Sequence, residues 1–197
     1  MDRSSVDGVE WRDYDRGEIG FRRKELSTAA SADRAGDEEL GCSLYELPPG
    51  KRSWPYHYHT GNAEAAYVLS GSGFVRRLGD GGENDDDPGD ADDRSDGEDG
   101  VAAGGGADHA GEIGREPVEA GDYLAFPADE SGGHQFGNDG EEPLRLLLVS
   151  TMNDPDVTVY PEQDKVGVFA GAPPGGRSGR DVDGFWRRED AVGYWEE

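Results

Sequence analysis

The chain of 197 residues predicts an all-β fold, and three observations support this prediction. Apolar residues occur in short alternating runs of strand length, such as residues 40–47 and 64–70. Glycine and proline turns, including Pro48-Pro49-Gly50, separate these runs. The most apolar run, residues 144–151, has the composition of a central strand. Short strands with turn signals between them are typical of a β-barrel or a β-sandwich.

The individual strands follow in chain order from the same pattern. Each is a run rich in apolar, β-branched or aromatic residues that ends at a turn or a polar loop. The expected strands are residues 21–26, 40–47, 57–59, 64–70, 74–78, 123–127, 134–138, 144–151, 157–160 and 166–169. We therefore divide the chain into an N-terminal extension (1–39), a barrel (40–170) and a C-terminal tail (171–197).

A glycine-rich acidic segment interrupts the predicted barrel at residues 79–115. It has 13 acids between Asp80 and Glu112 against one base, Arg94. The segment has almost no large apolar side chain, so it cannot bury enough surface to offset its ordering entropy. We predict a disordered acidic insertion between two strands, which is tolerated because loop-closure entropy grows slowly with length. His109 lies inside this segment, and we expect it to be solvated and not a ligand.

The formal net charge of −25 is extreme for a chain of this length. Aspartate outnumbers glutamate by 25 to 19, and only 3 of the 19 basic residues are lysine. We interpret this composition as adaptation to high salt, which screens repulsion between surface charges. The alternative is an acidic interaction protein. Either surface repels nucleic acid and anionic membranes, so we expect neither as a partner.

Cysteine usage and hydropathy limit the remaining classes. The single cysteine, Cys42, excludes an internal disulfide framework. No apolar run approaches the roughly 18 residues that are needed to cross a bilayer. The first residues show no apolar segment of a secretory signal. We therefore expect a soluble, cytoplasmic protein.

A candidate metal site is indicated by two of the four histidines, His57 and His59, which one residue separates. In a strand, side chains two positions apart leave the same face, so both imidazoles can point at one spot. Glu64 follows after a short turn and can reach that spot from the next strand. Imidazole and carboxylate ligands suit Fe, Mn, Zn, Ni or Cu. The pattern predicts a metal site and leaves the substrate open.

Two stretches of the chain resemble the two motifs of the cupin superfamily. Their residues are Gly50, His57, His59, Glu64 and Gly71 in the first stretch, and Gly121, Pro127, His134 and Asn138 in the second. Cupins are double-stranded β-helix barrels in which the motif histidines and glutamate bind one metal ion. The resemblance therefore implies this barrel, with one divalent transition metal (Fe, Mn, Zn or Ni). It further implies four ligands, which are His57, His59, Glu64 and His134.

The chain departs from the usual cupin motifs in two places. The first motif has one extra residue between Gly50 and His57, which lengthens a turn. The second has two extra residues between Pro127 and His134 and lacks a glycine, so we expect this loop to bulge. Residues 44–59 and 150–157 further resemble a group of small single-domain cupins of uncharacterised function. The resemblance implies a fold and a metal, and no particular reaction.

Three functions are compatible with such a site. The first is binding of a small metabolite at the metal, with no assigned reaction. The alternatives are an Fe(II)-dependent dioxygenase and a metal-dependent isomerase of sugars or keto acids. The motif strands contain no lysine or second carboxylate as general base, which disfavours an isomerase. We assign no catalytic residue, and the resemblance makes a homodimer an expected assembly.

Overall fold

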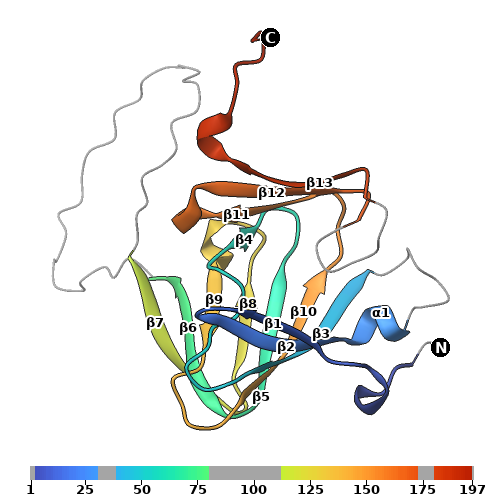
Figure 1. Cartoon of the computed structure of the whole chain (residues 1–197), viewed down its shortest axis with the longest axis vertical. Coiled ribbons are helices and arrows are strands. Elements are labelled where there is room, and N and C mark those ends of the chain that lie inside the picture. The colour runs from blue at the N-terminus through green and yellow to red at the C-terminus, as the bar shows by residue number, and fades with distance from the viewer. Residues whose placement is uncertain (1–2, 31–38, 80–111, 173–179, 197) are drawn as a thin grey trace, which may run out of the picture.

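The computed structural model describes residues 3–30, 39–79, 112–172 and 180–196. Strands make up most of these residues (Figure 1). They are β1 (Arg12–Arg16), β2 (Ile19–Glu25), β3 (Leu40–Leu47), β4 (Tyr58–His59), β5 (Glu64–Ser70), β6 (Ser72–Leu78), β7 (Ile113–Glu119), β8 (Tyr123–Phe126), β9 (His134–Gly137), β10 (Leu144–Thr151), β11 (Asp156–Tyr160), β12 (Lys165–Ala170) and β13 (Val182–Arg187). The helical pieces are α1 (Leu26–Ala30) and the 3-10 turns η1 (Val6–Gly8), η3 (Glu130–Gly132), η4 (Pro161–Gln163) and η5 (Arg188–Asp190). The predicted all-β class is confirmed.

The strands form three sheets, and every neighbouring pair is antiparallel. The six-stranded sheet has the order β1-β2-β3-β10-β5-β8, and the three-stranded sheet has the order β7-β6-β9. The four-stranded sheet, β13-β12-β11-β4, lies across one end of the other two (Figure 1). The sheets thus form a barrel whose interior is closed at that end by β11, β12 and β13.

Strand β10 is the central strand of the large sheet, as its apolar sequence predicts. It pairs with β3 on one side, where Leu146 faces Tyr45, and with β5 on the other, where Leu146 faces Val68. Leu144 and Leu146 are fully buried. Because successive side chains in a strand alternate between faces, these two leucines project together into the barrel.

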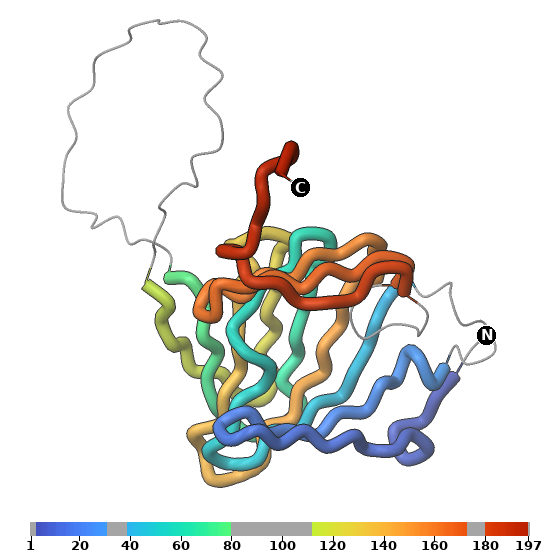
Figure 2. Tube along the Cα trace, turned by 45° about the horizontal axis from the view of Figure 1, so that its top comes forward, coloured from blue at the N-terminus to red at the C-terminus, as the bar shows by residue number. Residues whose placement is uncertain are grey.

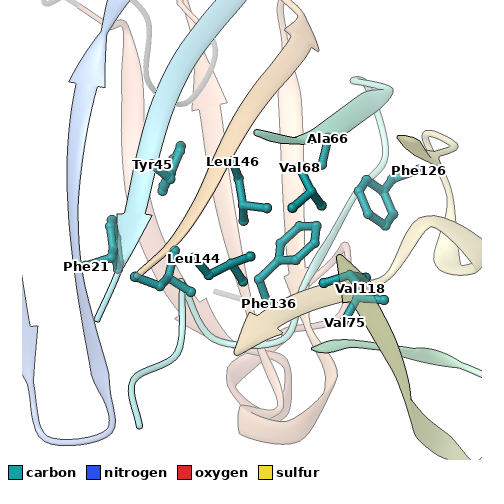
Figure 3. Close-up of a cluster of buried hydrophobic side chains, with 11 residues drawn as sticks. Phe21, Tyr45, Ala66, Val68, Val75, Val118, Phe126, Phe136, Leu144 and Leu146 are labelled. Carbon is teal, nitrogen blue, oxygen red and sulfur yellow. The ribbon is translucent and has the colours of Figure 1, made fainter. Parts of the chain in front are cut away.

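The hydrophobic core fills the interior of the barrel (Figure 3). Its eleven buried residues come from the six-stranded and the three-stranded sheets. Full burial of a large apolar side chain contributes roughly 1.5–3 kcal/mol to the stability of the fold. The eleven residues are Phe21, Tyr45, Leu47, Ala66, Val68, Val75, Val118, Phe126, Phe136, Leu144 and Leu146.

The N-terminal hairpin of β1 and β2 extends the large sheet beside β3 (Figure 2). Phe21 of β2 is only 3% exposed and belongs to the core. Tyr14 stacks on Phe21 with ring centroids 4.8 Å apart, and Trp54 packs edge-on against both rings. The hairpin therefore shares the barrel's hydrophobic core, although the sequence predicted only its second strand.

The predicted acidic insertion (79–115) lies between β6 and β7, but its predicted end was wrong, because residues 113–115 belong to β7 and pair with β6. These strands pair along their whole length, from Ser72 opposite Glu119 to Leu78 opposite Ile113. Beyond this pair, Gly79 N donates to Glu112 O at 3.0 Å. Residues 80–111, including His109, lie outside the described residues. The pairing of β6 with β7 brings the two ends of the insertion together, so no further contact is needed to close this loop.

The last strand, β13, pairs with β12 from Lys165 opposite Arg187 to Ala170 opposite Val182. Phe185 of β13 packs edge-on against Phe169 of β12, with ring centroids 5.8 Å apart. Residues 182–187, within the predicted tail, thus add a strand to the sheet that closes the barrel. In the described part of the chain, no helix is long and apolar enough to span a membrane.

Candidate metal centre

The four predicted ligands lie at strand ends around one cavity. His59 ends β4 and pairs with Thr158 of β11, whereas Glu64 begins β5 and His134 begins β9. His57 precedes β4 and forms an isolated antiparallel bridge with His134. In this bridge His134 N donates to His57 O at 2.9 Å, and His57 N donates to His134 O at 3.3 Å. The bridge ties the two motifs together at the site.

The side chains converge to metal-binding range. One ligand atom each from His57, His59 and Glu64 can be chosen so that all lie within 4.8 Å of one another. Glu64 Oε2 lies 3.7 Å from His59 Nε2 and 3.4 Å from His134 Nε2. Glu64 Oε2 is thus nearer to His134 than to His59, although His134 lies outside the group of three. The structure brings all four predicted residues together.

Every one of these histidines has its Nδ1 bound to an oxygen of the protein. The acceptors are Pro55 O at 2.7 Å for His57, Asp156 Oδ2 at 2.6 Å for His59 and Gly132 O at 2.9 Å for His134. Because an imidazole whose Nδ1 donates a proton keeps the lone pair on Nε2, the three Nε2 atoms are acceptors. This is the arrangement that metal-binding histidines require, with the outer nitrogen held by a carbonyl or carboxylate.

Burial and charge separate the protonation behaviour of the three imidazoles. Burial, then the neighbouring His134 and His59, holds the pKa of His57 well below its ordinary value. Burial also lowers the pKa of His134. Burial lowers the pKa of His59 as well, but the hydrogen bond to Asp156 and the charge of Glu64 outweigh it and raise the pKa overall. Burial thus favours neutral His57 and His134, whereas Asp156 and Glu64 favour the protonated form of His59, and a metal ion bound there would take the place of that proton.

The residues present fit a divalent transition metal. They combine three Nε2 acceptors, which are borderline soft, with one carboxylate, and all four side chains have their backbones anchored in strands or bridges. The buried histidines have no unpaired Nδ1 that would need water.

The bulge expected before His134 takes the form of the 3-10 turn η3. Asp129 caps this turn, because its Oδ1 accepts from Ser131 N at 2.9 Å. An aspartate at this position satisfies an N–H that the first turn of a helix leaves unpaired. The two additional residues are thus absorbed into a capped turn that ends immediately before β9.

Two glycines in and after this turn make the close approach to the barrel possible. A Cβ on Gly132 would collide with the carbonyl oxygen of Pro127, and one on Gly133 would collide with the hydroxyl of Tyr56. Gly132 O in turn accepts from His134 Nδ1. The lack of side chains therefore seats the turn tightly, and the seated turn orients the imidazole.

Asp156 is a functional candidate that the sequence did not single out. It begins β11, is 1% exposed, and accepts from His59 Nδ1 at 2.6 Å and from Gly61 N at 3.1 Å. Burial raises its pKa, but the hydrogen bonds from His59 and Gly61 outweigh it and lower the pKa overall. An ionised carboxylate that holds a ligand histidine strengthens the basicity of that ligand. The sequence signal that could have identified Asp156 is an aspartate at the start of an apolar strand. Aspartate is seldom fully buried without a partner, so an aspartate at such a position indicates a specific polar contact.

The cavity beside the four residues has a volume of about 220 Å³. Apart from the candidate ligands, its wall is mostly aromatic and aliphatic. The lining residues other than the ligands are Arg23, Tyr45, Ser53, Trp54, Phe136, Leu146, Leu148, Thr158, Tyr160, Phe169 and Phe185. A larger depression of about 580 Å³ lies over β7 and β8, but none of the candidate ligands lines it, so it has no part in this site.

Two aromatic side chains of the cavity wall are held in place by contacts with other residues. Trp54 lines the cavity and donates from Nε1 to Tyr45 Oη at 3.1 Å. Tyr160 stacks on His57 with ring centroids 5.7 Å apart, and burial raises the pKa of its phenol to about 12. The tyrosine is therefore a neutral hydroxyl at neutral pH, and it limits the movement of the His57 ring.

Comparison with known proteins supports the fold. No protein-family model and no curated protein sequence matches the chain. Among solved structures, a protein of Acidithiobacillus ferrooxidans described as a candidate sugar phosphate isomerase matches with a TM-score of 0.62 and 23% identity, over 97% of this chain and 93% of that one. A sugar phosphate isomerase of the cupin superfamily from Silicibacter pomeroyi matches with a TM-score of 0.62 and 22% identity, over 95% of this chain and 93% of that one. At these identities the similarity establishes the fold.

Proposed function

We propose that this chain, which has the cupin fold, is a metal-binding protein. It would hold a small metabolite beside a metal ion ligated by His57, His59, Glu64 and His134. One observation carries this proposal. The Nδ1 atoms of all three histidines are bound to protein oxygens, which leaves each Nε2 free beside the Glu64 carboxylate. A divalent ion held there would act as a Lewis acid toward an oxygen of a bound ligand.

Iron, manganese, zinc and nickel all suit this donor set. Three imidazoles and one carboxylate leave open coordination positions on a six-coordinate ion, and the cavity supplies space next to them. The protein's own contribution is to hold three imidazoles by their Nδ1 atoms, to orient His59 through Asp156, and to exclude bulk water with an aromatic wall.

The test of this proposal is the metal content of the purified protein. Wild type is expected to contain a stoichiometric metal, and both His57→Ala and His59→Ala are expected to retain only traces. His109→Ala serves as the matched control, since we expect that histidine to be solvated, and it should keep the wild-type content. Unchanged metal occupancy in both His57→Ala and His59→Ala would overturn the proposal.

A metal-dependent isomerase is the second candidate, because two similar structures are described as sugar phosphate isomerases, one of them as a candidate. Proton transfer between carbons needs a general base within reach of the substrate. Among the described residues that line the cavity, Glu64 is the sole carboxylate, and no lysine is present. Coordination would occupy Glu64, so binding without isomerisation is the better supported function.

The remaining alternative is an Fe(II)-dependent dioxygenase, and metal identity together with oxygen consumption distinguishes it from binding and isomerisation. An iron-containing protein that consumes O₂ when a small acid is added would support an Fe(II)-dependent dioxygenase. A zinc or manganese protein with no O₂ uptake would support binding or isomerisation. Both measurements use the protein as isolated.

We further propose that the protein is cytoplasmic, adapted to high salt and able to form a homodimer, with neither nucleic acid nor membrane as a partner. The support is the net charge of −25, which repels other polyanions and requires screening. Circular dichroism after dialysis into low salt is expected to show loss of folded structure. A chain that keeps its spectrum at low salt would argue against salt adaptation.

A further inference from the structure

Arg23 is the sole cationic side chain among the described residues that line the cavity. It comes from β2, in the N-terminal hairpin, and its side chain is 12% exposed. Its neighbour Arg22 points to the other face of the strand, where it pairs with Glu46 at 2.6 Å. The alternation of the strand therefore sends one arginine into the cavity and the next one away from it.

The protein holds the Arg23 guanidinium by one edge. Nε donates to Ser43 Oγ at 3.2 Å, and Nη2 pairs with Glu25 Oε1 at 2.9 Å. The guanidinium carbon also lies 5.6 Å from the centroid of the Tyr45 ring. Within the described residues no hydrogen bond involves Nη1. A planar guanidinium fixed at one edge presents its remaining N–H groups in a defined direction.

The pairing with Glu25 does not by itself explain why Arg23 lies at the cavity. Glu25 Oε2 is also paired with Arg12 Nη1 at 2.7 Å, so this carboxylate has a second basic partner outside the cavity. Arg23 and Glu64 line the same cavity. The cavity thus has one fixed positive group in addition to the cluster that suits a metal cation.

The rest of the wall is suited to an apolar body. Trp54, Phe136, Phe169 and Phe185 present aromatic surface, and Leu146 contributes aliphatic surface. The volume of about 220 Å³ is below the roughly 300–1,000 Å³ of sites for drug-sized ligands. The hydroxyls of the wall belong to Tyr45, Ser53, Thr158 and Tyr160, and the first three already have partners in the protein. A sugar with many hydroxyls would therefore find few partners, because buried polar groups need hydrogen bonds.

We propose that the cavity binds a small organic acid whose anionic group contacts Arg23 and whose apolar part rests on the aromatic wall. This inference rests on the proposed function and adds the chemical class of the ligand. The acid lies between two positive groups, the Arg23 guanidinium and the metal cation. Both a carboxylate and a phosphate monoester carry the anionic oxygens that an arginine recognises.

The experiment is calorimetric titration of the metal-loaded protein with benzoate, phenyl phosphate and the neutral benzamide. Arg23→Gln is expected to lower the affinity for at least one of the two anions roughly 10- to 100-fold, the loss that follows removal of a charged hydrogen-bond partner. Benzamide affinity should not change. The anion that loses more affinity identifies the group that Arg23 recognises.

The matched control is Arg22→Gln, which removes an arginine from the same strand but outside the cavity, and it should leave anion affinity unchanged. Arg23→Lys keeps the charge and the pairing with Glu25, so it should fold and retain intermediate affinity even where Arg23→Gln does not fold. Metal content is measured in every variant and is expected to match wild type.

Two results would overturn the inference. One is wild-type affinity for both anions in Arg23→Gln or, where that variant does not fold, in Arg23→Lys. The other is the absence of anion binding by the metal-loaded wild type. The metal readout keeps these results distinct from failure of the proposed function. A wild type without stoichiometric metal would refute the metal site, whereas a metal-loaded protein whose anion binding needs His57 but not Arg23 would refute this inference alone.

Discussion

His57, His59 and Glu64 come from eight consecutive residues, whereas His134 reaches the same cavity from a strand 70 positions after Glu64. In the first group, β4, β5 and the short turn between them position His59 and Glu64, and the bridge to His134 also holds His57. The second depends on a capped 3-10 turn, on two glycines pressed against the barrel and on the bridge to His57. The comparison shows that the local motif supplies three residues with ligand atoms within 4.8 Å of one another and that tertiary packing places the fourth beside Glu64.

The largest effect is expected on the local side of the site. Glu64→Gln removes the carboxylate that lies 3.7 Å from His59 Nε2 and 3.4 Å from His134 Nε2, and it leaves the shape of the side chain unchanged. We expect metal content to fall to traces, because the charge that offsets the cation is lost. Metal analysis checks this, with Glu116→Gln on the exposed face of β7 as the control. Retained stoichiometric metal in Glu64→Gln would remove Glu64 from the ligand set.

A smaller effect is expected from the residue that orients His59. Asp156→Asn keeps the size of the side chain but replaces an anionic acceptor of the His59 Nδ1 proton by a neutral amide. Loss of such an outer-shell partner lowers metal affinity roughly 10- to 100-fold. Competition with a chelator measures the change. The positioning role would be contradicted by wild-type metal affinity in this variant.

Gly132→Ala tests the part of the site that depends on tertiary packing, which is the turn before His134. The added methyl group would collide with Pro127 O, so the turn must shift and take the His134 imidazole with it. We expect a loss of about 1–3 kcal/mol in unfolding free energy, as for other overpacked sites, and weaker metal binding. Gly114→Ala has open space around its Cβ and serves as the control. A stable Gly132→Ala protein would show that the turn is not tightly seated.

The smallest effect is expected from the acidic insertion. Deleting residues 82–111 should leave metal content unchanged, because β6 and β7 pair directly up to Leu78 and Ile113 and the site lies in other strands. Metal analysis and thermal unfolding of the shortened chain check this. A large loss of metal would show that the insertion has a part in the site.

The sequence alone predicted most of the barrel and the candidate ligands, because the relevant information is local. Alternation identified strands such as β3, β5 and β10. The spacing of His57, His59 and Glu64 predicted their convergence, although β4 and β5 belong to different sheets and His57 lies outside β4. The position of His134 followed from a resemblance, and the structure brings it beside Glu64. The division into extension, barrel and tail stays a prediction.

The tertiary structure alone decided which distant residues complete the site. Asp156 lies 97 positions after His59, and Arg23 precedes Glu64 by 41 positions, so no local pattern joins them. Phe185 reaches the cavity only because β13 pairs with β12. A strand's own residues determine which face each side chain occupies, whereas sheet pairing determines which other strand that face meets. The candidate metal site is therefore largely readable from the chain, whereas the positions of Arg23 and of the apolar wall are a product of the fold.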